Sequence, residues 1–266
     1  MNKSRRIAVE KAAENVRNEC HVIDYGLRDI FEAAGKIGYR IIRYPIGSES
    51  FLGFALIRDD ERIIFSNSSS ILSREIFTVA HEIGHHMLHL SEMSGTFIKD
   101  DDLIDRDETE IEANYFAACL LMPAEKVDKF VRLELCEKEA NDWSNLDIAR
   151  IQTAFNVSYS MALNRLESLH VINSTLHARL QNEKMETTTS ELLRAISGNI
   201  DLSIPSGVKR VPEEYLEWVI SNYREKLIPV ESLKTALAYI GFDANDLEGL
   251  IANGREASKD SSREMG

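Results

Sequence analysis

Four histidines fall within nine consecutive positions of this 266-residue chain: His81, His85, His86 and His89. Residues 81–85 read H-E-x-x-H. Side chains four residues apart lie about 40° apart around a helix, so the imidazoles of His81 and His85 can reach one metal ion. Glu82 then lies beside the open coordination position, where it can act as a catalytic acid/base. The sequence therefore predicts a metal-dependent hydrolytic site on a helix.

The helix that carries this pattern is predicted over residues 71–90, and the Ser/Asn cluster of residues 66–70 offers hydroxyl groups as N-caps. Gly84 costs about 1 kcal/mol relative to alanine inside a helix, which indicates close approach of another segment. His86 is expected to be exposed. His89 either joins a polar shell around the metal or caps the end of the helix, where positive charge is favoured.

A catalytic zinc site has three protein ligands and a water, so a third ligand must come from elsewhere. The metzincin pattern is excluded because Leu88 and Ser91 stand where it needs glycine and histidine. A carboxylate from a later helix is the alternative.

The next predicted helix ends at Met122 and supplies that carboxylate. Glu110 and Asn114 are four residues apart on one face. Glu110 can therefore bind zinc while Asn114 accepts a hydrogen bond from the imidazole N–H of His81. Glu112 lies about 200° around the helix from Glu110 and is expected to face solvent.

Three strands are predicted before the H-E-x-x-H helix, over residues 39–44, 51–57 and 62–66. Polar residues 58–61 suit a hairpin turn between the last two. The strand 51–57 either receives an extended peptide along its edge or has only a structural role. Two amphipathic helices are predicted within residues 1–38.

The chain carries a formal net charge of -13, from 31 Lys+Arg against 44 Asp+Glu. Because sequence-independent affinity for nucleic acid comes from Lys and Arg, this balance argues against bulk DNA binding. Three cysteines, Cys20, Cys119 and Cys136, form no C-x-x-C pair and are expected to be small core residues. The start of the sequence does not read as a signal peptide, and no apolar run approaches the roughly 18 residues of a membrane span. A cytoplasmic location is expected.

Residues 146–169 read as two helices around a turn, a helix-turn-helix pattern. The charged side chains of residues 144–172 cancel, so there is no basic stripe for phosphates. Structural support of the core, or docking of a substrate, is favoured over DNA binding, and Tyr159 and Arg165 are the residues to test first. We expect five regions along the chain: a core (1–138), the helix-turn-helix-like segment (139–180), a linker (181–189), a C-terminal helical region (190–252) and a disordered tail (253–266).

The sequence HEIGHHMLH followed by ETEIEANYFAACLLMP resembles the ImmA/IrrE family of bacterial and phage zinc metallo-endopeptidases. The resemblance runs from about Asp24 to Ile172. It implies a gluzincin-like core of α+β class, in which a small antiparallel sheet packs on the H-E-x-x-H helix and on a second, glutamate-bearing helix. Helix-turn-helix-like and C-terminal helical segments follow.

The resemblance also implies a site and a function. His81, His85 and Glu110 would bind zinc and Glu82 would be the catalytic acid/base. Asn114 and His89 are the candidates that spacing along the helices offers for a shell around these ligands. Family members cleave helix-turn-helix transcriptional repressors and so relieve repression of mobile elements or stress-response genes. A protein substrate of that kind is therefore expected, without direct nucleic-acid binding or a membrane.

Several alternatives stay open from the sequence. The protein could instead bind a repressor without cutting it, or act as a toxin-like component of a two-gene module. Manganese or iron could replace zinc at two imidazoles and a carboxylate. Tyr44, Tyr115 and His89 are all candidates to stabilise an oxyanion.

Overall fold

The structure is a computed structural model that describes residues 1–47, 51–58, 61–90, 106–136 and 138–242. It divides into two compact units, Met1–Val208 and Lys209–Gly266. Unit 1 opens with helices α1 (Lys3–Glu19) and α2 (Ile30–Lys36), followed by strands β1 (Tyr39–Tyr44), β2 (Gly53–Arg58) and β3 (Glu61–Asn67). Its remaining α-helices are α3 (Leu72–His85), α4 (Arg106–Leu121), α5 (Ala124–Glu134), α6 (Asn145–Phe155), α7 (Tyr159–Ser168), α8 (Ser174–Lys184) and α9 (Thr189–Ala195). Unit 2 holds α10 (Tyr215–Arg224) and α11 (Val230–Tyr239).

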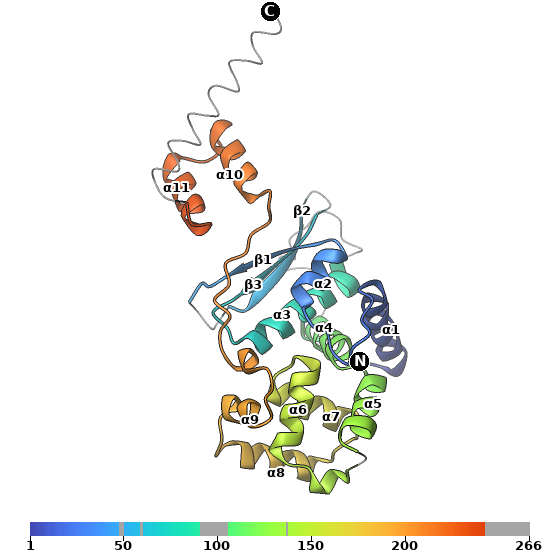
Figure 1. Cartoon of the computed structure of the whole chain (residues 1–266). Helices are drawn as coiled ribbons and strands as arrows, with labels where there is room; N and C mark the ends of the chain where they lie inside the picture. Colours follow the sequence, from blue (N-terminus) through green and yellow to red (C-terminus); the bar gives the residue numbers. More distant parts are fainter. Residues whose placement is uncertain (48–50, 59–60, 91–105, 137, 243–266) are drawn as a thin grey trace, which may run out of the picture. The chain divides into compact units, whose positions relative to one another are not determined.

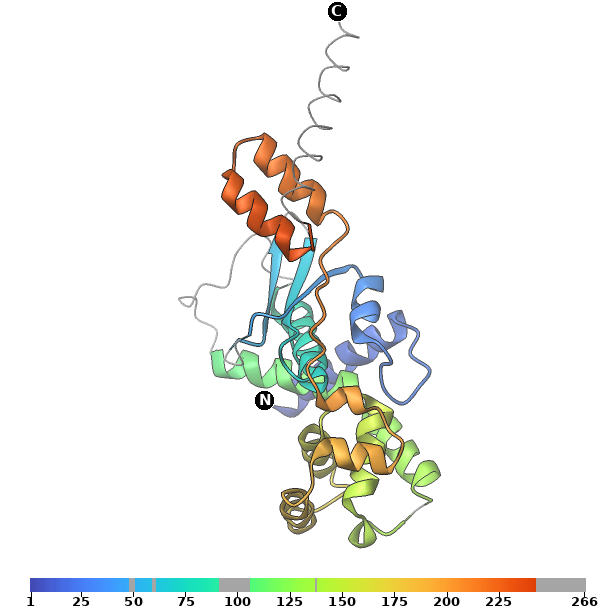
Figure 2. The same ribbon diagram turned by 60° about the vertical axis from the view of Figure 1, so that its left-hand side comes forward.

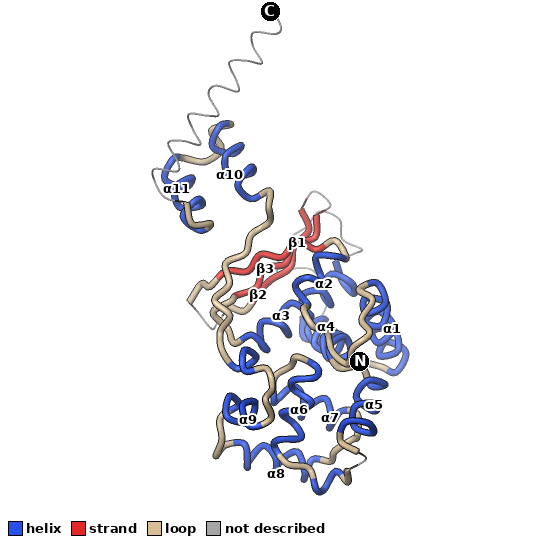
Figure 3. The backbone as a smooth tube through the Cα atoms, viewed as in Figure 1, coloured by secondary structure: helices blue, strands red, loops and turns tan. Residues whose placement is uncertain are grey.

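The three strands form one small sheet in the order β1-β3-β2 (Figure 3). The predicted hairpin is correct, since β2 pairs antiparallel with β3. The expectation of a wholly antiparallel sheet is wrong, because β1 pairs parallel with β3. The chain passes from β1 across to the far edge before β3 returns between the two. This order gives the central place to β3, whose Ile64 is fully buried, and leaves β2 as an edge strand.

One face of the sheet is covered by helices, and the metal-binding pattern lies on that side (Figures 1 and 2). Helix α3 packs on β2 and β3, while α2 packs on β1. Helix α4 lies against α3 and is covered in turn by α1. The fold is therefore α+β, as expected, with α3 held between the sheet and α4.

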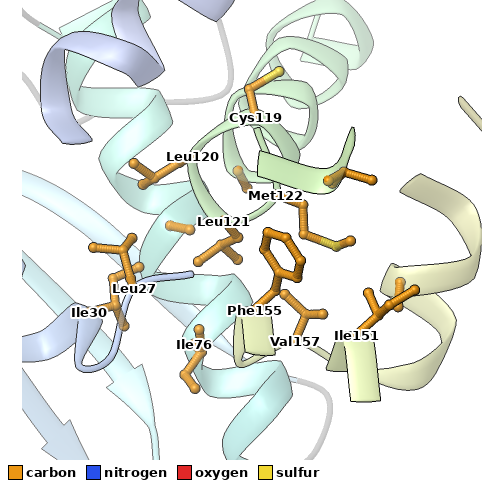
Figure 4. Packing of buried hydrophobic residues seen from close by; sticks show 14 of the residues in the cluster. Leu27, Ile30, Ile76, Cys119, Leu120, Leu121, Met122, Ile151, Phe155 and Val157 are labelled. Carbon is orange, nitrogen blue, oxygen red and sulfur yellow. The ribbon is translucent and has the colours of Figure 1, made fainter. Parts of the chain in front are cut away.

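The helix-turn-helix-like segment belongs to the same core as α3 and α4. Figure 4 shows Phe155 and Val157 packed against Leu121 and Met122 at the end of α4. Asn156 makes the turn between α6 and α7 with φ 54°, in the left-handed region. These helices are thus packed as part of the core of unit 1.

The two residues singled out in this segment are both buried. The Nε of Arg165 donates to the carbonyl oxygen of Met122 at 2.9 Å. The hydroxyl of Tyr159 is hydrogen-bonded to the side chain of Asn145 at 2.7 Å. Neither side chain is available to dock a substrate or DNA, because each is used to join helices.

The boundaries after residue 138 differ from the expected ones. The predicted linker over 181–189 begins within α8, where Leu180 is fully buried, and the compact units separate only after Val208. The predicted disordered tail over 253–266 lies outside the described residues. Among the cysteines, Cys119 is buried and Cys20 half-buried, but Cys136 is exposed, contrary to expectation.

The start of α3 is held by a segment distant in sequence rather than by the predicted serine caps. The N-cap residue is Ile71, which makes no side-chain capping bond. The N–H of Leu72 instead donates to the carbonyl oxygen of Ile204 at 2.9 Å. We call residues 204–208 the strap. It also bonds the loop after β3, where the hydroxyl of Ser68 donates to the carbonyl oxygen of Val208 at 2.7 Å.

A buried ion pair fixes the strap to α3 and the sheet. Arg43 of β1 donates two hydrogen bonds to the carboxylate of Glu75 on α3, each at 2.8 Å. The hydroxyls of Ser66 and Ser206 donate to the same carboxylate at 2.6 and 2.8 Å. The Arg43 guanidinium lies 3.6 Å from the ring centroid of Phe31. Glu75 therefore joins α3 to β1, to β3 and to the strap through one carboxylate that accepts four hydrogen bonds.

Replacing this carboxylate is expected to destabilise unit 1. Glu75→Gln keeps the shape but leaves Arg43 as a buried charge without its partner, which typically costs about 3–5 kcal/mol. Glu61→Gln is the matched control, because Glu61 pairs with Arg40 at a half-exposed position and such pairs contribute about 0–1 kcal/mol. Denaturant unfolding of both variants measures the difference. Equal losses would contradict a special role for Glu75.

Candidate metal centre

Helices α3 and α4 are in close contact at Gly84. A Cβ atom there would lie 3.0 Å from Cδ1 of Phe116 and 3.2 Å from Cα of Ala113. A larger residue would push the helices apart, so the predicted packing reason for this glycine is confirmed. His81 lies about one turn before Gly84 on α3 and His85 directly follows it, so the close contact brings both near α4.

The predicted ligand residues meet across this contact. The Nε2 atoms of His81 and His85 are 2.9 Å apart. The two carboxylate oxygens of Glu110 lie 3.3 Å from the Nε2 of His81 and of His85 respectively. All three side chains offer ligand atoms within 4.8 Å of one another. The structure thus brings two residues of α3 and one of α4 to a single point.

These separations suit a metal ion. Zinc ligands lie at about 2.0–2.1 Å in a tetrahedron, which separates neighbouring donor atoms by roughly 3.3 Å. Without a cation, the two nitrogens would meet only through a shared proton or with opposed lone pairs. The residues present therefore fit the metal that the sequence pattern implies.

The protonation state of both histidines, neutral near pH 7, favours metal binding. With the amide oxygen of Asn114 facing it at 3.0 Å, the Nδ1 of His81 carries the proton and its Nε2 is left with a lone pair. Burial lowers the pKa of His81, and the charge of Glu110 opposes that shift. Burial, followed by the neighbouring histidines, lowers the pKa of His85 to about 3. Both imidazoles are consequently neutral donors near pH 7.

Glu82 lies on the buried side of this ligand group, beside the sheet. Burial is the main cause that raises its pKa to about 7, with the charge of Glu110 adding to the shift. A hydrogen bond from the backbone of Ala55 in β2 opposes the rise. A carboxyl that titrates near neutral pH can both accept and return a proton, as an acid/base catalyst must.

Glu112 does not face solvent as expected. Its side chain is only 7% exposed and pairs with Arg5 of α1, with Arg5 Nη2 2.6 Å from Glu112 Oε2. The hydrogen bonds from Arg5 lower the pKa of Glu112. The prediction failed because it considered α4 alone, whereas α1 covers this face of the helix. No local pattern in residues 106–122 signals that cover.

His86 is also buried rather than exposed, with its ring 5.1 Å from the ring of Tyr39 in an edge-on contact. The helix does not continue regularly to Leu90: after His85 it becomes a π-helix over His86–Leu90. The wider turn of a π-helix changes which side chains face inward. The prediction for His86 assumed the regular angle of an α-helix and therefore placed its side chain on the wrong side.

Two of the candidates for an oxyanion stabiliser, Tyr115 and His89, contact other residues. The hydroxyl of Tyr115 is hydrogen-bonded to Glu10 of α1. His89 lies beside Glu112, with its Nε2 3.8 Å from Oε2 of that residue, and its ring centroid is 5.6 Å from that of His85. His89 is thus near the ligands but outside the converging group.

No helix among the described residues combines the length and apolar character needed to cross a bilayer.

The raised pKa of Glu82 predicts a pH-dependent stability in the metal-free protein. The folded chain keeps this proton up to about pH 7, whereas the unfolded chain releases it near the ordinary value of 4.5. Between these values the unfolded chain binds fewer protons, so the free energy of unfolding falls as pH rises. Glu82→Gln cannot lose a proton here, and its melting temperature should rise relative to the wild type from about pH 4.5 to about pH 8. A pH-independent difference would contradict the shift.

Comparison with known proteins places this arrangement in a family. The model of Peptidase_M78, the IrrE N-terminal-like domain, matches residues 34–167, about half of the chain. "Uncharacterized immunity region protein 2" of Bacillus phage phi105 is 30% identical over 110 residues, which cover 41% of this chain and 68% of the phage protein.

A solved structure, "Mycobacterium tuberculosis transcriptional regulator", is 17% identical with a TM-score of 0.40. The match covers 62% of this chain and 47% of that one, so this chain spans about half its length. The family match includes both the H-E-x-x-H helix and the helix that carries Glu110. The chain belongs to the Peptidase_M78 family of IrrE N-terminal-like domains.

Proposed function

We propose that this chain is a zinc-dependent endopeptidase of gluzincin type that cleaves a helix-turn-helix transcriptional repressor at a specific peptide bond. Family membership indicates a metallopeptidase. The observation that carries the proposal further is the convergence of His81, His85 and Glu110, with Glu82 buried beside them. Two imidazoles and one carboxylate, with an adjacent acid/base, are the ligand set of a zinc hydrolase.

The proposed roles follow from the surroundings of each residue. Zinc, when bound, would supply a Lewis acid that makes water more acidic and polarises the scissile carbonyl. His81 and His85 would hold it as neutral donors, with Asn114 fixing the tautomer of His81. Glu82 would accept a proton from the attacking water and pass it to the leaving amine. Its buried position keeps the proton affinity of the carboxylate high enough for both steps.

An extended protein segment is the substrate that the sheet supports best. Strand β2 is an edge strand, so its outer backbone groups can pair with an added strand. Ala55 of this strand lies at the catalytic side, since its backbone is hydrogen-bonded to Glu82. Phe51 and Phe54 beside it are 41% and 37% exposed and provide apolar contact area. A peptide lying along β2 would pass next to the acid/base.

A regulatory protein is proposed as that substrate. The resemblance to the ImmA/IrrE family favours a helix-turn-helix repressor, and the phage relative is named as an immunity region protein. Cleavage would relieve repression of a mobile element or of stress-response genes. We propose a cytoplasmic location. We also propose no direct contact with nucleic acid, because the side chains of Tyr159 and Arg165 are buried within the fold.

Glu82→Gln separates cleavage from binding. The variant should retain zinc, because the three ligands are unchanged, and lose about 10²–10⁴-fold in peptidase rate, the usual contribution of an acid/base. Incubating a candidate repressor with wild-type and variant protein, followed by gel electrophoresis and measurement of bound zinc, tests both points. A chelator should abolish the wild-type fragments.

His85→Ala serves as the second arm, since it should lose both zinc and cleavage. A Glu82→Gln protein with wild-type activity would disprove the assignment of the acid/base. Release of the repressor from DNA without any fragments, by both wild type and Glu82→Gln, would instead support the non-cleaving binder.

A further inference from the structure

We propose that Arg5 is a positioning residue for the metal ligand Glu110 and acts through Glu112. The inference rests on the proposed metal site and extends it to α1. Arg5 grips Glu112 with two hydrogen bonds: its Nε is 2.7 Å from Oε1 and its Nη2 is 2.6 Å from Oε2. Such a paired geometry fixes orientation as well as distance.

A second contact holds the same part of α4 from the side of α3. His89, in the π-helix, lies 3.8 Å from the carboxylate of Glu112 and is hydrogen-bonded to the backbone of Thr109. Thr109 and Glu112 stand one residue before and two residues after Glu110. The ligand is thus bracketed by two positions that Arg5 and His89 hold in place.

Glu110 needs such support because little holds its own side chain. Its side chain is 48% exposed, and among the described residues it contacts the two histidines of the ligand group. It also lies close to the first turn of α4, which begins at Arg106. A small rotation of this turn would displace the carboxylate, whereas His81 and His85 would stay on α3. Outer contacts that orient ligands commonly change metal affinity by about 10–100-fold.

The contact also shows why α1 belongs to the site. Arg5 lies outside residues 34–167, which match the family model. Helix α1 packs along α4, and its Val9 and Ala13 are buried in the core. Arg5 is at the end of α1 that reaches the turn bearing Glu110, so the helix brings a cation to the part of α4 that positions the ligand.

The test measures zinc affinity of the full-length protein by competition with a chromogenic chelator. Arg5→Met should weaken zinc binding by about 10–100-fold. Arg5→Lys should lose less, because it keeps the charge but not the paired hydrogen bonds. Arg6→Met is the matched control: Arg6 is the next residue on α1 and lies over the ring of Tyr115 on α4, 5.6 Å from its centroid. Its zinc affinity should stay within about twofold of wild type.

Two further variants separate positioning from general support by α1. Glu112→Gln keeps the side-chain shape and should weaken zinc binding as Arg5→Met does. The double variant should lose no more than the larger single loss, because the two residues act as one unit. Val9→Ala should lower the melting temperature through a core cavity and leave zinc affinity unchanged.

The outcomes distinguish this inference from the proposed function. If the wild type binds one zinc ion and Arg5→Met binds it within twofold, only the role of Arg5 is disproved. The same conclusion follows if Val9→Ala weakens zinc binding as much as Arg5→Met. If the wild type binds no zinc, both the metal site and the role of Arg5 are rejected.

Discussion

The close contact of α3 with α4 at Gly84 is the constraint on which the site depends. Any side chain at this position would meet Ala113 and Phe116, so the absence of one lets the helix axes approach. The histidines and the glutamate then face each other across a space of metal-ion size. The elements that surround α3 and α4 limit how these two helices can move. The sheet lies behind α3, α1 covers α4, and the strap closes the first turn of α3.

Local patterns in the sequence were sufficient to predict the elements that carry the proposed site. The i, i+4 spacing of His81 and His85, and of Glu110 and Asn114, describes one helical face each, and the structure brings those faces together. The strand over residues 39–44 was also predicted with its observed bounds. These features depend on residues close in sequence, for which periodicity is a direct physical signal.

Several of the errors have a different cause, a segment far away in the chain. Glu112 is buried because Arg5, more than a hundred positions earlier, covers it. The start of α3 needs no serine cap because the carbonyl of Ile204 takes that role. The parallel pairing of β1 with β3 follows from the choice of a central strand, which alternation within each strand does not specify. His86 was misplaced for a local reason, the π-helix that follows His85.

Four glutamates on α3 and α4 show how position rather than residue type sets their chemistry. Glu75 accepts four hydrogen bonds and is committed to structure. Glu112 is held by Arg5, and its lowered pKa keeps it ionised as the anchor of that contact. Glu110 is half-exposed and faces two neutral imidazoles, which leaves its charge available to a cation. Glu82 is buried near that charge without a cationic partner among the described contacts, so its proton affinity rises.

The two carboxylates with fixed partners, Glu75 and Glu112, support the scaffold, and the two without them, Glu82 and Glu110, form the proposed site. A bound cation would add the missing positive charge next to both Glu82 and Glu110, which explains why the fold can leave two uncompensated carboxylates so close together.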